Sequence, residues 1–185
     1  MDKGDASETV EIHKNMSSIN TNSVSLAGEF AVLSQLALRG YDANMTLGRT
    51  KGVDILVSDP SSARMIRLEV KTNYRSRSAG GNSRLFGKFV SAWMMGEKHE
   101  KMKDPNLFFC FVNISEDTKH FRFYIVPSAV VADYVKASHQ LWLDDESSHS
   151  RETTMRVFRI GTREEEYRTR TPVVEDYEDN WDFKG

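Results

Sequence analysis

Apolar and polar positions alternate in short runs along much of the chain, and segments rich in Gly, Pro, Ser and Asn separate these runs. Side chains on a strand point alternately to opposite faces of a sheet, so a two-residue period predicts half-buried strands, and a short continuous apolar run predicts a fully buried one. By these criteria we expect strands at Tyr41–Leu47, Gly52–Val57, Arg64–Lys71, Phe108–Ile114 and Phe121–Val126.

Three longer segments instead carry apolar residues at helical spacing. The first is Ser25–Arg39, with an apolar stripe that includes Leu26, Phe30 and Leu36 and a C-cap at Gly40. A second helix is expected over Phe86–Met102, and a third from Pro127 to about Lys136. The resulting α-β-β-β-α-β-β-α order predicts an α/β fold in which helices flank a central mixed sheet of about five strands.

A length of 185 residues is typical of one domain with its own core. We expect this core at residues 24–143. Residues 1–23 are rich in Ser, Asn and Thr and are expected to be flexible. Residues 144–185 form an acidic extension, expected to pack on the same domain through its apolar residues, with Trp181 as an anchor.

Charge is unevenly distributed. The formal net charge is -2, yet residues 64–103 hold ten Lys and Arg against three Glu, which gives +7. Phosphate recognition requires local cations and not a high overall pI. We therefore expect Arg75, Arg77, Arg84 and Lys88, in and after the loop that follows the third strand, to hold a nucleic-acid backbone. For Lys98–Lys103, an ordinary solvated helix face is an equally good interpretation.

The cellular location is predicted from segments that the sequence lacks and from its cysteine content. The sequence contains neither a bilayer-length apolar stretch nor a basic-then-apolar leader, so we expect no membrane association. Its one cysteine, Cys110, lies in an apolar run and is expected to be a buried thiol. A reducing, cytoplasmic location is therefore expected.

The first candidate site residues lie in the third predicted strand, Arg64–Lys71. Alternation places Ile66, Leu68 and Val70 on one face, and Glu69 and Lys71 together on the other, roughly 6.5–7 Å apart along the strand. Such a Glu-x-Lys pattern is common on exposed sheet faces and by itself predicts little. Its context makes it a candidate site.

That context is supplied by two further acidic residues. If the strands around Asp54 and Glu69 pair as a hairpin, the two carboxylates approach each other and require a cation between them. Mg²⁺ suits such a pair because it takes oxygen ligands from carboxylates, water and phosphate. Glu29, between Leu33 and Leu36 on the first helix, is expected to point inward, where an uncompensated charge would be unfavourable.

Together these residues resemble a known family. A helix bearing Glu29, followed by Gly-Val-Asp54-Ile-Leu-Val and Leu-Glu69-Val-Lys71-Thr, is similar to the PD-(D/E)xK nuclease superfamily, over roughly residues 24 to 135. Members share the restriction-endonuclease-like fold and include Holliday junction resolvases. One departure is Val53, where the motif has Pro.

The resemblance implies a Mg²⁺-dependent endonuclease that hydrolyses DNA, with Mn²⁺ able to substitute. It further implies that Asp54 and Glu69 bind the metal, that Lys71 positions the attacking water, that Glu29 is an auxiliary acid, and that the chain forms a homodimer. Two alternatives stay open. The four charged residues can form a structural ion network in a catalytically inactive nucleic-acid-binding module, and the acidic extension also suits a protein-interaction domain.

Overall fold

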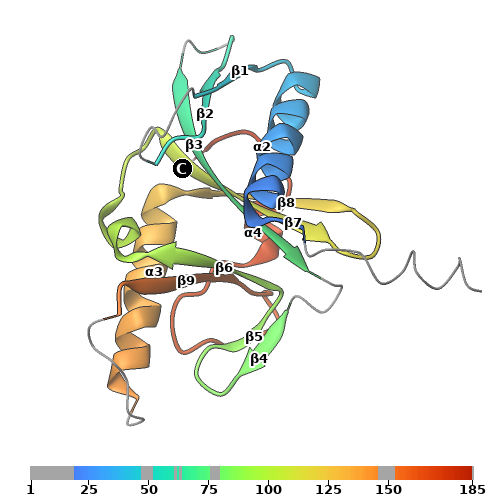
Figure 1. Ribbon diagram of the computed structural model, residues 1–185. Coiled ribbons are helices and arrows are strands. Elements are labelled where there is room, and N and C mark those ends of the chain that lie inside the picture. Colours follow the sequence, from blue (N-terminus) through green and yellow to red (C-terminus); the bar gives the residue numbers. More distant parts are fainter. Residues whose placement is uncertain are drawn as a thin grey trace, which may run out of the picture.

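The centre of the protein is a mixed five-stranded β-sheet (Figure 1). The structure is a computed structural model that describes residues 19–46, 52–60, 62, 64–75, 80–145 and 153–184. The strand order is β1 (Asp42–Met45), β2 (Ile55–Ser58), β3 (Met65–Arg75), β7 (Leu107–Ser115) and β8 (Phe121–Pro127). The five predicted strands and the α/β class are therefore confirmed.

One of the four strand pairs in the sheet is parallel. β1, β2 and β3 form an antiparallel meander, β3 and β7 are parallel, and β7 and β8 are antiparallel. A parallel pair requires a long crossover connection. This crossover contains β4 (Gly81–Ser83), β5 (Gly87–Phe89), β6 (Ser91–Gly96) and the short 3-10 helix η1 (Glu97–Lys101).

The helix predicted for the crossover, over Phe86–Met102, is wrong. In β6 the buried residues Ser91, Trp93 and Met95 alternate with more exposed ones, and Met94 is 56% exposed. This period of two is that of a strand. β6 pairs with β9 (Met155–Ile160), whose distance along the chain hides the pairing from local patterns.

Two hydrophobic cores lie on opposite faces of the sheet. Helix α2 (Thr21–Leu38) covers one face, where its Val32 and Leu36 pack with Leu68 and Val70 of β3. Helix α3 (Ser128–Asp144) and the β6–β9 pair cover the other face (Figure 1), around Phe109, Phe111, Val131, Tyr134 and Phe158. Cys110 is fully buried, as predicted.

The buried stripe of α2 differs from the predicted one. Gly28, Val32 and Leu36 face the sheet, whereas Leu26 and Phe30 are 45% and 56% exposed. A side chain at position 28 would overlap Thr72, so Gly28 lets the helix lie directly against β3. This close approach positions the helix over the strand that carries Glu69 and Lys71.

Both ends of the described chain join this fold. Asn20 caps α2 by accepting a 2.8 Å hydrogen bond from the Asn22 amide, so residues 21–23, predicted to be flexible, belong to the helix; residues 1–18 lie outside the described part. In the C-terminal extension, β9 joins β6 and a short helix, α4 (Val174–Tyr177), follows. Trp181 and Phe183 are buried in the first core, which confirms the predicted packing role of Trp181.

Candidate active site

Asp54 and Glu69 lie side by side where β2 begins. The amide of Asp54 donates to the Leu68 carbonyl at 2.8 Å, and Oδ2 of Asp54 accepts from the Val70 amide at 2.7 Å. These two bonds bracket Glu69 on β3, with Ile55 opposite Leu68 in the antiparallel register. The predicted hairpin is confirmed, and it brings the two carboxylates together.

The Glu69 carboxylate is almost completely buried, with 2% of the residue exposed. Its Oε1 atom lies 2.6 Å from Nζ of Lys71, 3.1 Å from Nε2 of His99 and 3.7 Å from Nζ of Lys98. Its Oε2 atom is buried and has no hydrogen-bond partner among the described residues. A buried carboxylate oxygen without a donor is rare in proteins and calls for an explanation.

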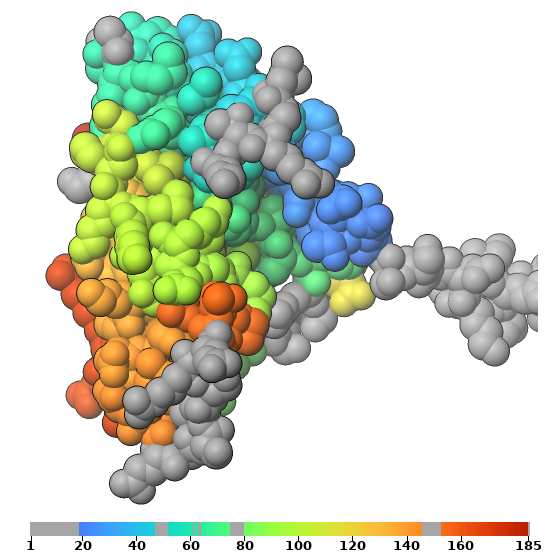
Figure 2. All heavy atoms as spheres, turned by 60° about the vertical axis from the view of Figure 1, so that its left-hand side comes forward, coloured from blue at the N-terminus to red at the C-terminus, as the bar shows by residue number. Residues whose placement is uncertain are grey.

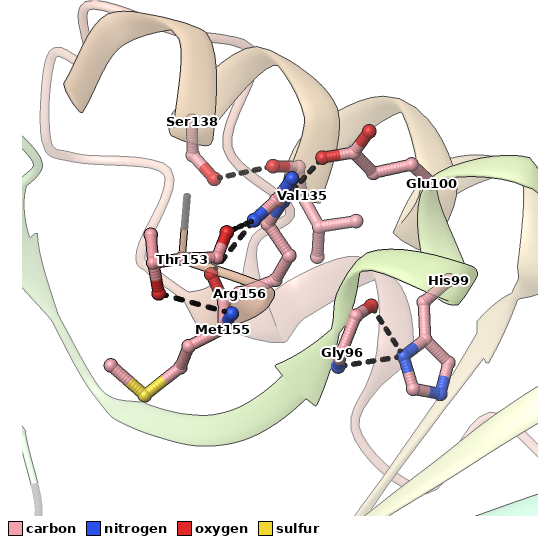
Figure 3. Close-up of polar contacts among 8 residues, drawn as sticks. All are labelled: Gly96, His99, Glu100, Val135, Ser138, Thr153, Met155 and Arg156. Carbon is pink, nitrogen blue, oxygen red and sulfur yellow. Dashed lines mark hydrogen bonds and ion pairs between the residues drawn. The ribbon is translucent and has the colours of Figure 1, made fainter. Parts of the chain in front are cut away.

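His99 reaches Glu69 from η1. Nδ1 of His99 lies 2.9 Å from the Gly96 amide nitrogen and 2.8 Å from the Gly96 carbonyl oxygen (Figure 3), and Nε2 donates to Oε1 of Glu69. The ring also packs edge-on against Phe109. Contacts with Gly96, Glu69 and Phe109 therefore fix the orientation of the His99 ring.

His99 could not be recognised as a site residue from the sequence. The five histidines are scattered, and no spacing among them suggests a metal site. His99 meets Glu69 only because the crossover folds back over β3, so the sequence offers no local signal for this contact.

The pKa of Glu69 shows which effect dominates at the centre of the site. Burial by itself raises this pKa, but the hydrogen bond from His99 and the charge and hydrogen bond of Lys71 outweigh it and lower the pKa to about 2. Glu69 is therefore ionised across the physiological range.

The pKa values of Asp54 and Glu29 shift in the opposite direction, upward. Burial raises the pKa of Asp54; the Val70 hydrogen bond and Lys71 oppose this shift, and Glu69 adds to it. Burial also raises the pKa of Glu29, with a further rise from Asp54 and an opposing effect of Lys71. Glu29 is half-buried on α2 and interacts electrostatically with both residues, so all four predicted residues share one site. Additional positive charge there would lower the pKa of both the Asp54 and the Glu29 carboxyl groups.

A hard cation fits these donors. Asp54 and Glu69 offer carboxylate oxygens, and Oε2 of Glu69 needs a partner. The Gly52 backbone passes close to this atom with φ +76°, and a Cβ at position 52 would lie 3.3 Å from Oε2. Within the described residues there is no group of three or more His, Cys, Asp or Glu side chains that could hold a metal. A metal here would depend on two carboxylates, with water and substrate completing its shell, as Mg²⁺ tolerates.

Two of the four residues predicted to hold nucleic acid lie away from the carboxylates. Arg84 and Lys88 are exposed on the β4–β5 hairpin, at the opposite end of the molecule from β1 and β2 (Figure 1). Nη2 of Arg84 lies 2.7 Å from both carboxylate oxygens of Asp145. Arg77 and the side chain of Arg75 lie outside the described residues.

Other cations of the basic segment also have acidic partners. Arg67 pairs with Asp104 and Lys103 with Asp133. Lys98, predicted with equal weight to lie on a solvated face, is 58% exposed and reaches Glu69. The formal +7 of the segment is therefore partly neutralised locally, and Lys71 and Lys98 are its cations at the carboxylates.

Comparisons with known proteins give little beyond this geometry. No protein-family model and no curated protein sequence matches the chain. Among solved structures, a bacterial homing endonuclease is similar with a TM-score of 0.46 and 14% sequence identity, over 88% of each chain. No helix of the described part is long and apolar enough to cross a membrane.

Proposed function

We propose that the chain is a metal-dependent nuclease of the PD-(D/E)xK type that hydrolyses phosphodiester bonds of DNA, with Mg²⁺ as cofactor and Mn²⁺ as a substitute. One observation carries the proposal: a buried Glu69 carboxylate beside Asp54 has one oxygen held by cations, while the other has no hydrogen-bond partner among the described residues. A purely structural ion pair would be expected to satisfy both oxygens.

Asp54 and Glu69 would hold the metal. Oδ2 of Asp54 is engaged by the Val70 amide, so its other oxygen is the natural ligand. On Glu69, His99 and Lys71 engage Oε1, which directs Oε2 toward the ion. Bound there, Mg²⁺ would polarise the scissile phosphate and lower the pKa of a coordinated water.

Lys71 and Lys98 would act on the substrate side. Lys71 is 28% exposed at its side chain, so its ammonium can contact both the Glu69 carboxylate and a molecule bound next to it. It would align the attacking water and offset the negative charge that develops on phosphorus. The more exposed Lys98 would contact an adjacent phosphate.

Glu29 would act as an auxiliary acid. Its raised pKa arises partly from Asp54, so a cation bound by Asp54 would favour ionised Glu29 as well. We further propose that Arg75, Arg77, Arg84 and Lys88 contact the DNA backbone outside the site, and that two copies of the chain act together.

The proposal is tested by incubating the chain with duplex, branched and single-stranded DNA in Mg²⁺, Mn²⁺ or EDTA. We expect cleavage with either metal and none in EDTA. Asp54→Asn and Lys71→Ala should each abolish cleavage, whereas the matched surface variants Asp42→Asn and Lys101→Ala should retain it. Cleavage that survives Asp54→Asn would refute the mechanism.

A second function is favoured by a different observation. Oε1 of Glu69 already meets Lys71, His99 and Lys98, so this cluster can be a structural ion network in a catalytically inactive DNA-binding module. Calorimetry distinguishes the two functions. Heat of Mg²⁺ binding that Asp54→Asn abolishes supports the nuclease, and DNA binding without any Mg²⁺ binding supports the module.

A further inference from the structure

A groove of about 280 Å³ lies between α3, β9 and the turn that joins β4 to β5. Alternation along β9 builds one wall: Met155, Val157 and Arg159 line the groove, while Phe158 and Ile160 are buried in the second core. Figure 3 shows two parts of the groove lining, Ser138 of α3 and the start of β9. Figure 2 shows that α3 and the start of β9 adjoin on one face of the molecule. Its volume is near the lower end of the range of small-ligand sites, about 300 Å³.

Among the described residues, those that line the groove include two arginines and no acidic residue. Arg156 is 7% exposed and pairs with Glu100, so its charge is compensated. Arg159 is half-buried, and its guanidinium lies 3.8 Å from the centre of the Phe86 ring. No carboxylate within the described part of the chain pairs with it. A partly desolvated cation without a counter-charge favours an anionic ligand.

Aromatic rings form the other walls of the groove. Phe86 lies under the Arg159 guanidinium, and Trp142 of α3 is stacked against His139 with ring centres 5.5 Å apart and planes 22° apart. Rings and a guanidinium on one surface bind flat, aromatic, anionic molecules, as single-stranded nucleic-acid sites do.

We propose that this groove binds a single nucleotide, with its base stacked on Trp142 and its phosphate paired with Arg159. The ligand chemistry is the same for a free nucleotide and for one nucleotide of a strand. The surroundings favour a strand, because the Arg156–Glu100 pair (Figure 3) joins the groove to η1, where Lys98 and His99 contact Glu69. On this proposal, a strand bound at the candidate active site continues past η1 into this groove. This last step rests on the proposed function.

The test is made in the Asp54→Asn chain, so that cleavage cannot obscure binding. Thymidine monophosphate, inorganic phosphate and a short single-stranded DNA are each titrated while tryptophan fluorescence is recorded. Trp93 and Trp181 are 3% and 5% exposed, and Trp142 is the more exposed tryptophan, so stacking is expected to quench chiefly Trp142. Trp142→Phe should abolish most of the quenching while labelled DNA still binds, as measured by fluorescence anisotropy.

Two groove variants measure the affinity. Trp142→Ala should weaken binding of the single strand about tenfold or more, as loss of one base stack does. Arg159→Met keeps the apolar contact with Phe86 but removes the charge; it should weaken binding and reduce the salt slope by about 0.7. Phe30→Ala, on the exposed face of α2, and Lys136→Met, on α3 outside the groove, are the matched controls.

Each outcome of these experiments leads to one conclusion. Affinities of both groove variants within about twofold of the parent chain would overturn the proposal, as would an affinity for inorganic phosphate equal to that for the nucleotide. Binding of the mononucleotide but not the strand would assign a free nucleotide as the ligand. Groove binding, together with no DNA cleavage by the parent chain, would refute only the nuclease function, and cleavage by the parent chain with no groove binding would refute only this inference.

Discussion

Nε2 of His99 lies 3.1 Å from Oε1 of Glu69, and each side chain is only 3% exposed. The two residues are 30 positions apart and come from η1 and β3. A buried carboxylate is stable as an anion only when donors replace the water it has lost. His99 supplies one of those donors, and this makes it a positioning residue for the carboxylate next to Asp54.

Replacing His99 by Ala should raise the pKa of Glu69 above its value of about 2 and reduce the free energy of unfolding by about 1–3 kcal/mol, because a buried charge loses a donor. Carbon-detected NMR of the Glu69 carboxyl gives the pKa, and urea unfolding gives the stability. His99→Gln, which keeps an N–H donor, should recover part of both effects. An unchanged Glu69 pKa in His99→Ala would contradict the assigned contact.

Glu69 should make the fold sensitive to acid. Its folded-state pKa of about 2 is below the ordinary value of 4.5, so its ionised form adds stability above about pH 4.5, and this contribution is lost as the pH falls toward 2. The contribution is about 3 kcal/mol. Urea midpoints measured across this range should fall more steeply for the parent chain than for Glu69→Gln, and equal slopes would show that Glu69 is not stabilised as an anion.

Asp54→Asn should have opposite effects on stability and on metal binding. Burial raises the pKa of Asp54, so its charge is unfavourable without a cation, and Asn can still accept from the Val70 amide. We expect the metal-free variant to be as stable as the parent or more stable at pH 7. Mg²⁺ at about 100 times its Kd should stabilise the parent by about 2.7 kcal/mol and leave Asp54→Asn unaffected. Thermal unfolding with and without Mg²⁺ measures this, and Asp42→Asn should behave like the parent.

Gly28→Ala should destabilise the chain by about 1–3 kcal/mol, although Ala is the better helix former, because the added methyl group overlaps Thr72. Thr72→Ala in the same chain should recover part of the loss. Ser34→Ala, at an exposed position of α2, serves as the control and should leave stability unchanged or slightly raise it. A stabilising Gly28→Ala would mean that α2 does not lie this close to β3.

Arg84 can contact DNA only if it leaves Asp145, to which its guanidinium is bonded. Arg84→Ala should therefore weaken duplex binding and lower the salt slope by about 0.9, whereas Asp145→Asn should strengthen binding. The exposed pair Arg163 and Asp176 provides the matched control, since Arg163→Ala should leave the salt slope unchanged. Fluorescence anisotropy at several salt concentrations measures both.

Much of the fold and part of the site could be predicted from local patterns in the sequence. Alternation in β3 placed Ile66 and Leu68 in the core and put Glu69 and Lys71 together on the other face, where they form a 2.6 Å ion pair. The same alternation in β6, around Trp93, does not exclude a helix, because a short apolar run is compatible with both periods. The difference lies in the partner strand, β9, which a local pattern cannot include.

The sequence by itself determined the strands of the central sheet, the burial of Cys110 and Trp181, and the nearness of Asp54 to Glu69, because each depends on periodicity or on a short hairpin. Only the tertiary structure decided that His99 donates to Glu69, that Arg84 pairs with Asp145, and that β9 and α3 enclose a groove with Arg159. These contacts join segments tens of residues apart. They form because the crossover, α3 and β9 must cover the second face of the sheet to bury its apolar side chains.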